Sequence, residues 1–143
     1  MKIKNLVDNT TSFLLKRFSE LIGLALLCLS ILLLASLISY TPEDPNFIFP
    51  ENAEIKNLLG ARGSYASDIL FQSIGLISLL VPISFFLISV SVIIDKKILH
   101  IIESLFFIIL YSIIGALFFT VFHTESYWLT INGNNGFLGN LFE

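Results

Sequence analysis

Long uncharged apolar runs alternate with short polar segments along this chain. The uncharged runs cover residues 21–40, 69–94 and 104–122. Each has about the length of the ~20-residue helix that crosses a bilayer. Lipid offers the backbone no hydrogen-bond partner, so such runs form helices, and they lack the period-2 alternation of a membrane barrel. The pattern predicts an all-α membrane protein, a helical transmembrane bundle with short interfacial segments and three spans at about 19–40, 69–94 and 98–122.

Composition strengthens this prediction. Hydrophobic residues make up 55% of the 143 residues and charged residues only 13%, whereas a typical soluble domain has about 25% charged residues. One soluble core cannot bury three uncharged runs of this length. We therefore expect residues 1–143 to form a single integral membrane domain that contacts the lipid bilayer. The first run is longer than the core of a signal peptide and no clear Ala-x-Ala site follows it, which favours a retained span.

Basic residues are distributed unevenly between the two ends of the expected spans. Four precede the first run, two lie between the second and third, and two share residues 41–68 with five acidic residues. In that order they are Lys2, Lys4, Lys16, Arg17, Lys96, Lys97, Lys56 and Arg62. Cytoplasmic loops are enriched in Lys and Arg, so we expect a cytoplasmic N-terminus. The expected segments are a cytoplasmic basic lead-in at 1–18, a periplasmic loop at 41–68, a cytoplasmic turn at 95–97 and a periplasmic tail at 123–143.

Proline and glycine mark the expected breaks in the helices. Pro42 and Pro45 predict a turn directly after the first span. Gly60 and Gly63 are expected to break a short interfacial helix that follows it. Pro82 lies inside the second uncharged run, where a proline removes one helical hydrogen bond, so a kink is expected there.

His100 and Glu103 are the best candidates for chemistry within the membrane. Three residues apart on a helix, they share a face and could relay protons. They also lie close to Lys97, at the membrane surface, where polar side chains can reach water. A stand-alone small multi-span transporter or channel component using His100 and Glu103 is therefore the alternative function.

Signatures of catalysis are missing from the sequence. It contains no G-x-x-x-x-G-K-[ST] loop for phosphate, no G-x-S-x-G serine and no cluster of metal-ligating residues. We therefore expect no catalytic, cofactor-binding or metal-binding residues, and a chain that is not itself an enzyme.

Several short stretches match the pattern of one known family. Residues 39–46 read S-Y-T-P-E-D-P-N and resemble the S-Y-x-P-x-D-P-S stretch that closes the first span of FtsK/SpoIIIE-type DNA translocases. Residues 57–72 are similar to that family's N-x-L-G-x-x-G-A-Y-x-A-D-x-L-F-Q, and Gly75 and Pro82 continue its pattern. Residues 136–139 resemble its G-G-x-x-G turn. The resemblance covers roughly residues 18 to 142.

This resemblance implies the family's N-terminal four-span membrane domain, truncated before the fourth span, toward which the 123–143 tail would lead. Its implied function is membrane anchoring, oligomerisation and septum localisation for a DNA translocase involved in chromosome segregation and cell division. The implied location is the bacterial inner membrane. The implied partners are further copies of the chain and other division proteins. DNA, ATP and Mg would be handled only by the family's motor domain, which has no counterpart here.

The resemblance also singles out a set of residues with an implied structural role. They are Tyr40, Pro42, Asp44, Pro45, Gly60, Gly63, Asp68 and Pro82. The sequence departs from the family pattern at Asn46, which replaces a common Ser, and at Asn135, where the turn often has Gly.

Overall fold

The computed structural model is all helical over the residues that it describes. These are 2–45, 54–96, 98–123, 129, 131 and 133–142, with side chains from residue 9 onward. In chain order the elements are α1 (Lys2–Ile38), α2 (Gly60–Ile74), the 3₁₀ helix η1 (Gly75–Leu79), α3 (Leu80–Asp95), α4 (Leu99–Phe122) and α5 (Gly136–Asn140).

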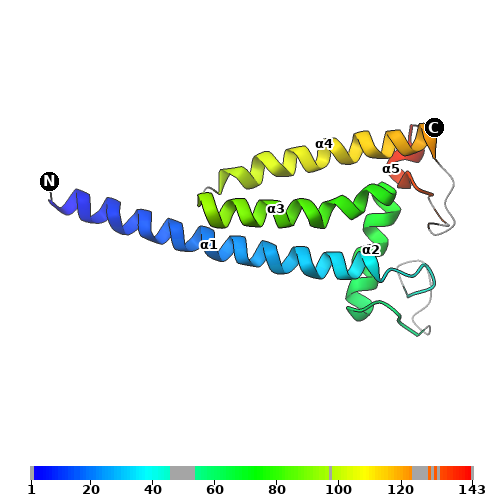
Figure 1. Ribbon diagram of the computed structural model, residues 1–143, viewed down its shortest axis with the longest axis horizontal. Coiled ribbons are helices and arrows are strands. Elements are labelled where there is room, and N and C mark those ends of the chain that lie inside the picture. The colour runs from blue at the N-terminus through cyan, green and yellow to red at the C-terminus, as the bar shows by residue number, and fades with distance from the viewer. Residues whose placement is uncertain are drawn as a thin grey trace.

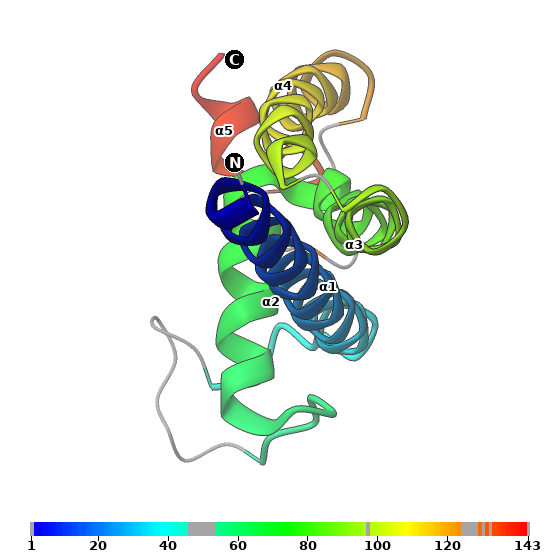
Figure 2. The same ribbon diagram turned by 90° about the vertical axis from the view of Figure 1, so that its left-hand side faces the viewer.

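Three long helices lie side by side in alternating directions (Figure 1). α3 runs antiparallel to α1, α4 returns beside α3, and the first part of α1 projects beyond the α3–α4 turn. Figure 2, viewed from the N-terminal side, has α1, α3 and α4 at the corners of a triangle. Three helical stretches, Asn9–Ile38, Gly60–Asp95 and Leu99–Phe122, are long and apolar enough to cross a membrane. The predicted all-α membrane fold with three spans is confirmed.

The first helix starts earlier than the expected span. A lead-in at 1–18 and a span from 19 were expected as separate segments, but α1 is one helix from Lys2 to Ile38. Its polar part contains neither proline nor glycine, and Phe13, Leu14 and Phe18 continue the helical spacing into the apolar part. The lead-in is therefore the first half of the helix.

The second uncharged run divides between two directions. α2 ends at Ile74 and runs across the end of the bundle, whereas α3 runs along it (Figure 1). Gly75, with φ 65°, makes the turn between them. The second run turns at Gly75 and not at the expected Pro82, which lies in the first turn of α3, where a helix tolerates proline.

The expected break at Gly63 is wrong. α2 begins at Gly60, whose φ of 64° turns the chain into the helix, and continues through Gly63 without interruption. Gly63 is buried, and a Cβ there would collide with the side chains of Asn57 and Leu59. Its small size therefore serves packing and not helix termination.

The core lies where α1 meets α2 and α3. Buried Leu37, Tyr40, Phe71 and Leu129 form its apolar cluster. Between α1 and α3, the Ser30 hydroxyl donates a hydrogen bond to the Pro82 carbonyl oxygen at 2.7 Å. Hydroxyls that bond across helices, together with small residues at the contact, are typical of helix packing in membranes. The outer surfaces of all three long helices carry exposed Leu, Ile and Phe, as lipid contact requires.

The last described segment folds back onto the bundle. α4 ends at Phe122, close to the expected limit of the third span. α5 then packs against α4 and α2, and the Asn135 side-chain amide donates hydrogen bonds to Thr120 at 3.3 Å and Asn140 at 2.7 Å. Parts of all four expected segments lie outside the described residues. They are Met1 of the lead-in, residues 46–53 of the loop, Lys97 of the 95–97 turn, and residues 124–128, 130, 132 and 143 of the tail.

Candidate functional site

Most of the residues that the family pattern singles out meet at one end of the bundle. We call this region the cap and define it as the described residues 39–45 and 54–68, which cover the end of α1 (Figure 1). Seven of the eight pattern residues belong to the cap: Tyr40, Pro42, Asp44, Pro45, Gly60, Gly63 and Asp68. Pro82 lies apart from them, in α3.

Asp44 closes the loop of the cap. Its side chain is only 1% exposed. One carboxylate oxygen accepts a hydrogen bond from the backbone N–H of Lys56, and the other accepts one from the backbone N–H of Asn57, both at 2.9 Å. Hydrogen bonds to an ionised acceptor are about twice as strong as neutral ones. Asp44 therefore ties together the two ends of a loop whose middle is not described.

Asn57 joins the cap to α1. Its side-chain N–H donates to the backbone carbonyl of Ser36 at 2.9 Å, and its side-chain oxygen accepts from the Leu59 N–H at 3.1 Å. The Ser36 hydroxyl donates in turn to the Gly63 carbonyl at 2.6 Å. Sequence reasoning did not select Asn57, although Asn57 opens the second family-like stretch and could have been found from it.

Tyr40 and Asp68 link the end of α1 to the middle of α2. The Tyr40 hydroxyl donates to the Asp68 carboxylate at 3.2 Å, and the Gln72 amide reaches the same oxygen at 3.4 Å. The Tyr40 ring packs on Phe71 with centroids 4.8 Å apart. Both polar and apolar contacts thus hold α2 where it crosses α1.

Further contacts complete the cap. The Ser64 hydroxyl donates to the Pro45 carbonyl at 2.9 Å. On the surface, the Lys56 ammonium lies 3.0 Å from the Glu43 carboxylate. This hydrogen-bonded partner raises the pKa of Lys56 above its usual value. Both side chains are largely exposed, so the pair contributes little to stability.

His100 and Glu103 form a contact of their own on α4. Nδ1 of His100 lies 3.3 Å from the Glu103 carboxylate, and the two side chains are 38% and 68% exposed. A cleft of about 330 Å³ lies between α3 and α4. Its lining is Ser84, Leu87, Ile88, Ser91, Ser104, Phe107, Ile108 and Tyr111. His100 and Glu103 are not among the residues that line this cleft, and the channel alternative stays a prediction.

The polar groups of the cap serve to hold its segments together. Its carboxylates accept hydrogen bonds from backbone amides, a phenol and a side-chain amide. Within the described part of the chain, no group of three or more His, Cys, Asp or Glu residues could hold a metal ion. The arrangement holds α2 at a fixed angle across the bundle.

The fold and the cap define a class, the multi-pass helical membrane domains. A family model for the 4TM region of DNA translocase FtsK/SpoIIIE matches residues 15–143. The chain belongs to this family.

Individual relatives agree with this assignment. The chain is 39% identical to a DNA translocase FtsK of Rickettsia bellii (strain RML369-C) over 54 residues, which cover 38% of this chain and 7% of the relative. It is 37% identical to a DNA translocase FtsK of Azospirillum brasilense over 68 residues, 46% of this chain and 11% of the relative. The chain thus matches only a small part of each relative's length. No solved structure matches the chain.

Proposed function

We propose that the chain is the membrane-anchoring domain of a DNA translocase that acts in chromosome segregation and cell division. The observation that carries the proposal is the family match over residues 15–143. The match includes all the cap residues that lock α2 onto α1. In this proposal the chain supplies no catalytic group, and a motor domain elsewhere in the protein uses ATP and Mg to move DNA.

Oligomerisation and septum localisation are part of the same proposal. α4 buries only Ser112 and Ala116 among its residues, so most of its apolar surface is open to lipid or to another copy of the chain. We propose a homo-oligomer that gathers with other division proteins at the septum.

The proposed location is the bacterial inner membrane with the N-terminus in the cytoplasm. Lys16, Arg17 and Lys96 gather at the end of the bundle opposite the cap, and the acidic Glu43 and Glu54 belong to the cap end. This separation supports a cytoplasmic side at the basic end and a periplasmic side at the cap, by the positive-inside rule.

The experiment is localisation of the chain in dividing bacteria. A fluorescent protein fused to the N-terminus of residues 1–143 should give a band at the division site. Asp44→Ala, which opens the cap, should spread the signal over the membrane, whereas the matched control Glu43→Ala should keep the band. A uniform membrane signal for the unchanged chain, at normal expression and membrane insertion, would refute the septal role.

A further inference from the structure

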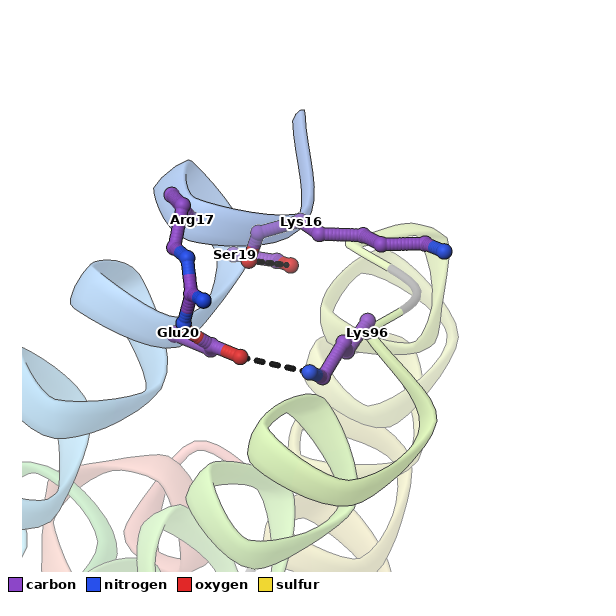
Figure 3. Close-up of polar contacts among 5 residues, drawn as sticks. All are labelled: Lys16, Arg17, Ser19, Glu20 and Lys96. Atoms are coloured by element: carbon purple, nitrogen blue, oxygen red, sulfur yellow. Dashed lines mark hydrogen bonds and ion pairs between the residues drawn. The ribbon is translucent and has the colours of Figure 1, made fainter. Parts of the chain in front are cut away.

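Three charged side chains are paired at the end of the bundle opposite the cap, and a fourth, Lys16, lies beside them on α1 (Figure 3). The Glu20 carboxylate on α1 pairs with the Arg17 guanidinium at 2.6 Å through one oxygen and with the Lys96 ammonium at 2.5 Å through the other. In this view the Lys16 side chain extends from α1 to the side on which Lys96 lies. We call Lys16, Arg17 and Lys96, together with Glu20, the cationic cluster.

Lys96 occupies a position where the backbone favours glycine. It directly follows α3 with φ 56°, and among the described residues it is the only one other than glycine with positive φ. A side chain with a Cβ is strained in this left-handed conformation, which is why glycine commonly follows a helix there. Backbone strain of this kind clusters at functional sites, which makes the Lys96 side chain a candidate for a functional group.

The helices beneath the cluster are held close together. Ser19 is completely buried, and its hydroxyl donates to the Lys16 carbonyl at 2.9 Å. One turn further on, Gly23 lies against Ile93 of α3 with no room for a Cβ. The backbone of α1 is therefore fixed next to the end of α3. This packing also fixes the backbone positions from which the cationic side chains extend.

The cluster has more positive than negative charge. Two cations pair with the Glu20 carboxylate and Lys16 adds a third positive charge, while the neighbouring Asp95 accepts a hydrogen bond from the Ser91 hydroxyl at 3.2 Å. Even with Asp95 counted, one positive charge is in excess. Among the described residues Lys16 forms no ion pair, and Lys96 remains 37% exposed, so an anion can reach both ammonium groups.

Apolar surface adjoins this excess charge. Phe18 of α1 is 57% exposed and Ile94 of α3 is 69% exposed. Both belong to helical stretches that are apolar enough to lie in a membrane. A ligand bound here would have its anionic group at the ammonium groups and its apolar part along the helices. A free anion uses only the first of these features, whereas a phospholipid uses both.

We propose that the cationic cluster is a binding site for the phosphate of an anionic phospholipid. Lys16 and Lys96 contact the phosphate oxygens, while Glu20 holds Lys96 in reach and stays paired with Arg17. The acyl chains lie along the exposed apolar surface of α1 and α3. Basic residues between membrane helices bind lipid headgroups in this way. The site does not depend on the septal role proposed above.

The test measures which lipids the chain retains. The chain is placed in nanodiscs of phosphatidylcholine with a small fraction of phosphatidylglycerol, and the lipids that stay bound are counted by native mass spectrometry. Phosphatidylglycerol should be enriched. The double variant Lys16→Gln/Lys96→Gln should lower the enrichment about fivefold for each cation removed. The matched control Lys56→Gln/Arg62→Gln, which removes the same charge at the cap end, should leave it unchanged.

A second variant separates binding from folding. Lys96→Gly relieves the strained backbone, so its thermal unfolding temperature should stay the same or rise while the enrichment falls about fivefold. Equal enrichment in the cluster variants and the cap-end control would overturn the proposal. Loss of bound phosphatidylglycerol on addition of millimolar inorganic phosphate, at unchanged ionic strength, would also overturn it and assign the site to a free anion.

Discussion

At the scale of single residues, two buried carboxylates set the chemistry of the cap. Asp44 is 1% exposed and Asp68 is 4% exposed. Burying a charge is costly unless hydrogen bonds satisfy it. Asp44 receives two backbone N–H groups, and Asp68 receives the Tyr40 phenol and the Gln72 amide. Hydrogen-bond geometry, more than apolar burial, therefore specifies how the cap closes.

Asp44→Ala should destabilise the fold strongly. It removes both hydrogen bonds that join the ends of the cap loop and leaves the N–H groups of Lys56 and Asn57 without their acceptors. A hydrogen bond to a charged group contributes about 1.5–3 kcal/mol, so we expect a loss of about 3 kcal/mol. The measurement is unfolding of the chain in detergent, followed by circular dichroism.

Two further variants define this experiment. Glu43→Ala removes a neighbouring carboxylate that is 79% exposed, so its effect should stay within about 0.5 kcal/mol. Asp44→Asn keeps one acceptor oxygen and should fall between the two. If Asp44→Ala and Glu43→Ala unfold alike, the carboxylate of Asp44 does not hold the cap.

At the scale of elements, the turn between α2 and α3 depends on Gly75. Its φ of 65° and ψ of −147° lie in a region that is essentially restricted to glycine. A Cβ at Gly75 would also collide with the backbone of Asn134, whose carbonyl accepts a hydrogen bond from the Leu76 N–H at 2.9 Å. The same glycine thus turns the chain and lets the tail pack against the turn.

Gly75→Ala should therefore cost more than Gly60→Ala. Gly60 also has positive φ, but a Cβ there meets no atom within 4 Å, so only backbone strain of about 1–2 kcal/mol applies. Gly75→Ala adds overpacking, typically about 1–3 kcal/mol, to a stronger backbone strain. Thermal unfolding of both variants in the same detergent compares them. Equal losses would mean that the contact with Asn134 contributes nothing.

Hydropathy predicted the number and helical type of the membrane-spanning stretches but not the direction of every segment. The run 69–94 is uncharged throughout, so it reads as one span, yet the chain turns at Gly75. That turn is fixed by the contact with Asn134, which no pattern within the run contains. Pro82 carries the stronger local signal for a break, but it lies where a helix tolerates proline.

The cap was predictable as a set of residues and not as a set of contacts. The family pattern singles out Tyr40, Asp44 and Asp68, but composition and periodicity do not reveal which residues they form hydrogen bonds with. Tyr40 finds Asp68 only because α2 crosses α1, and Asn57 reaches Ser36 for the same reason. Gly63 was misread because its role is to make room for Asn57, a contact between two segments.

At the scale of the whole molecule, charge and hydrogen bonding differ between the two ends of the bundle. One end carries the cationic cluster, where the cationic groups exceed the carboxylates. The other end carries the cap, where the carboxylates of Asp44 and Asp68 are buried and satisfied internally. Electrostatic attraction to an anionic membrane surface acts on exposed basic groups. The two ends are therefore suited to different sides of the membrane.

This difference predicts the orientation of the chain. Leu58 in the cap and Leu99, the first residue of α4 at the expected membrane surface, are 74% and 73% exposed, so the rest of the chain shields neither position from a maleimide. The single native cysteine, Cys28, is exposed on α1 and is first replaced by alanine. In intact cells with a permeable outer membrane, a reagent that cannot cross the inner membrane should label Leu58→Cys and not Leu99→Cys. After the inner membrane is opened, both should react.

Labelling of Leu99→Cys alone in intact cells would show that the orientation is the reverse of the one predicted. The cationic cluster would then face the periplasmic leaflet, and the cap would have to act from the cytoplasm.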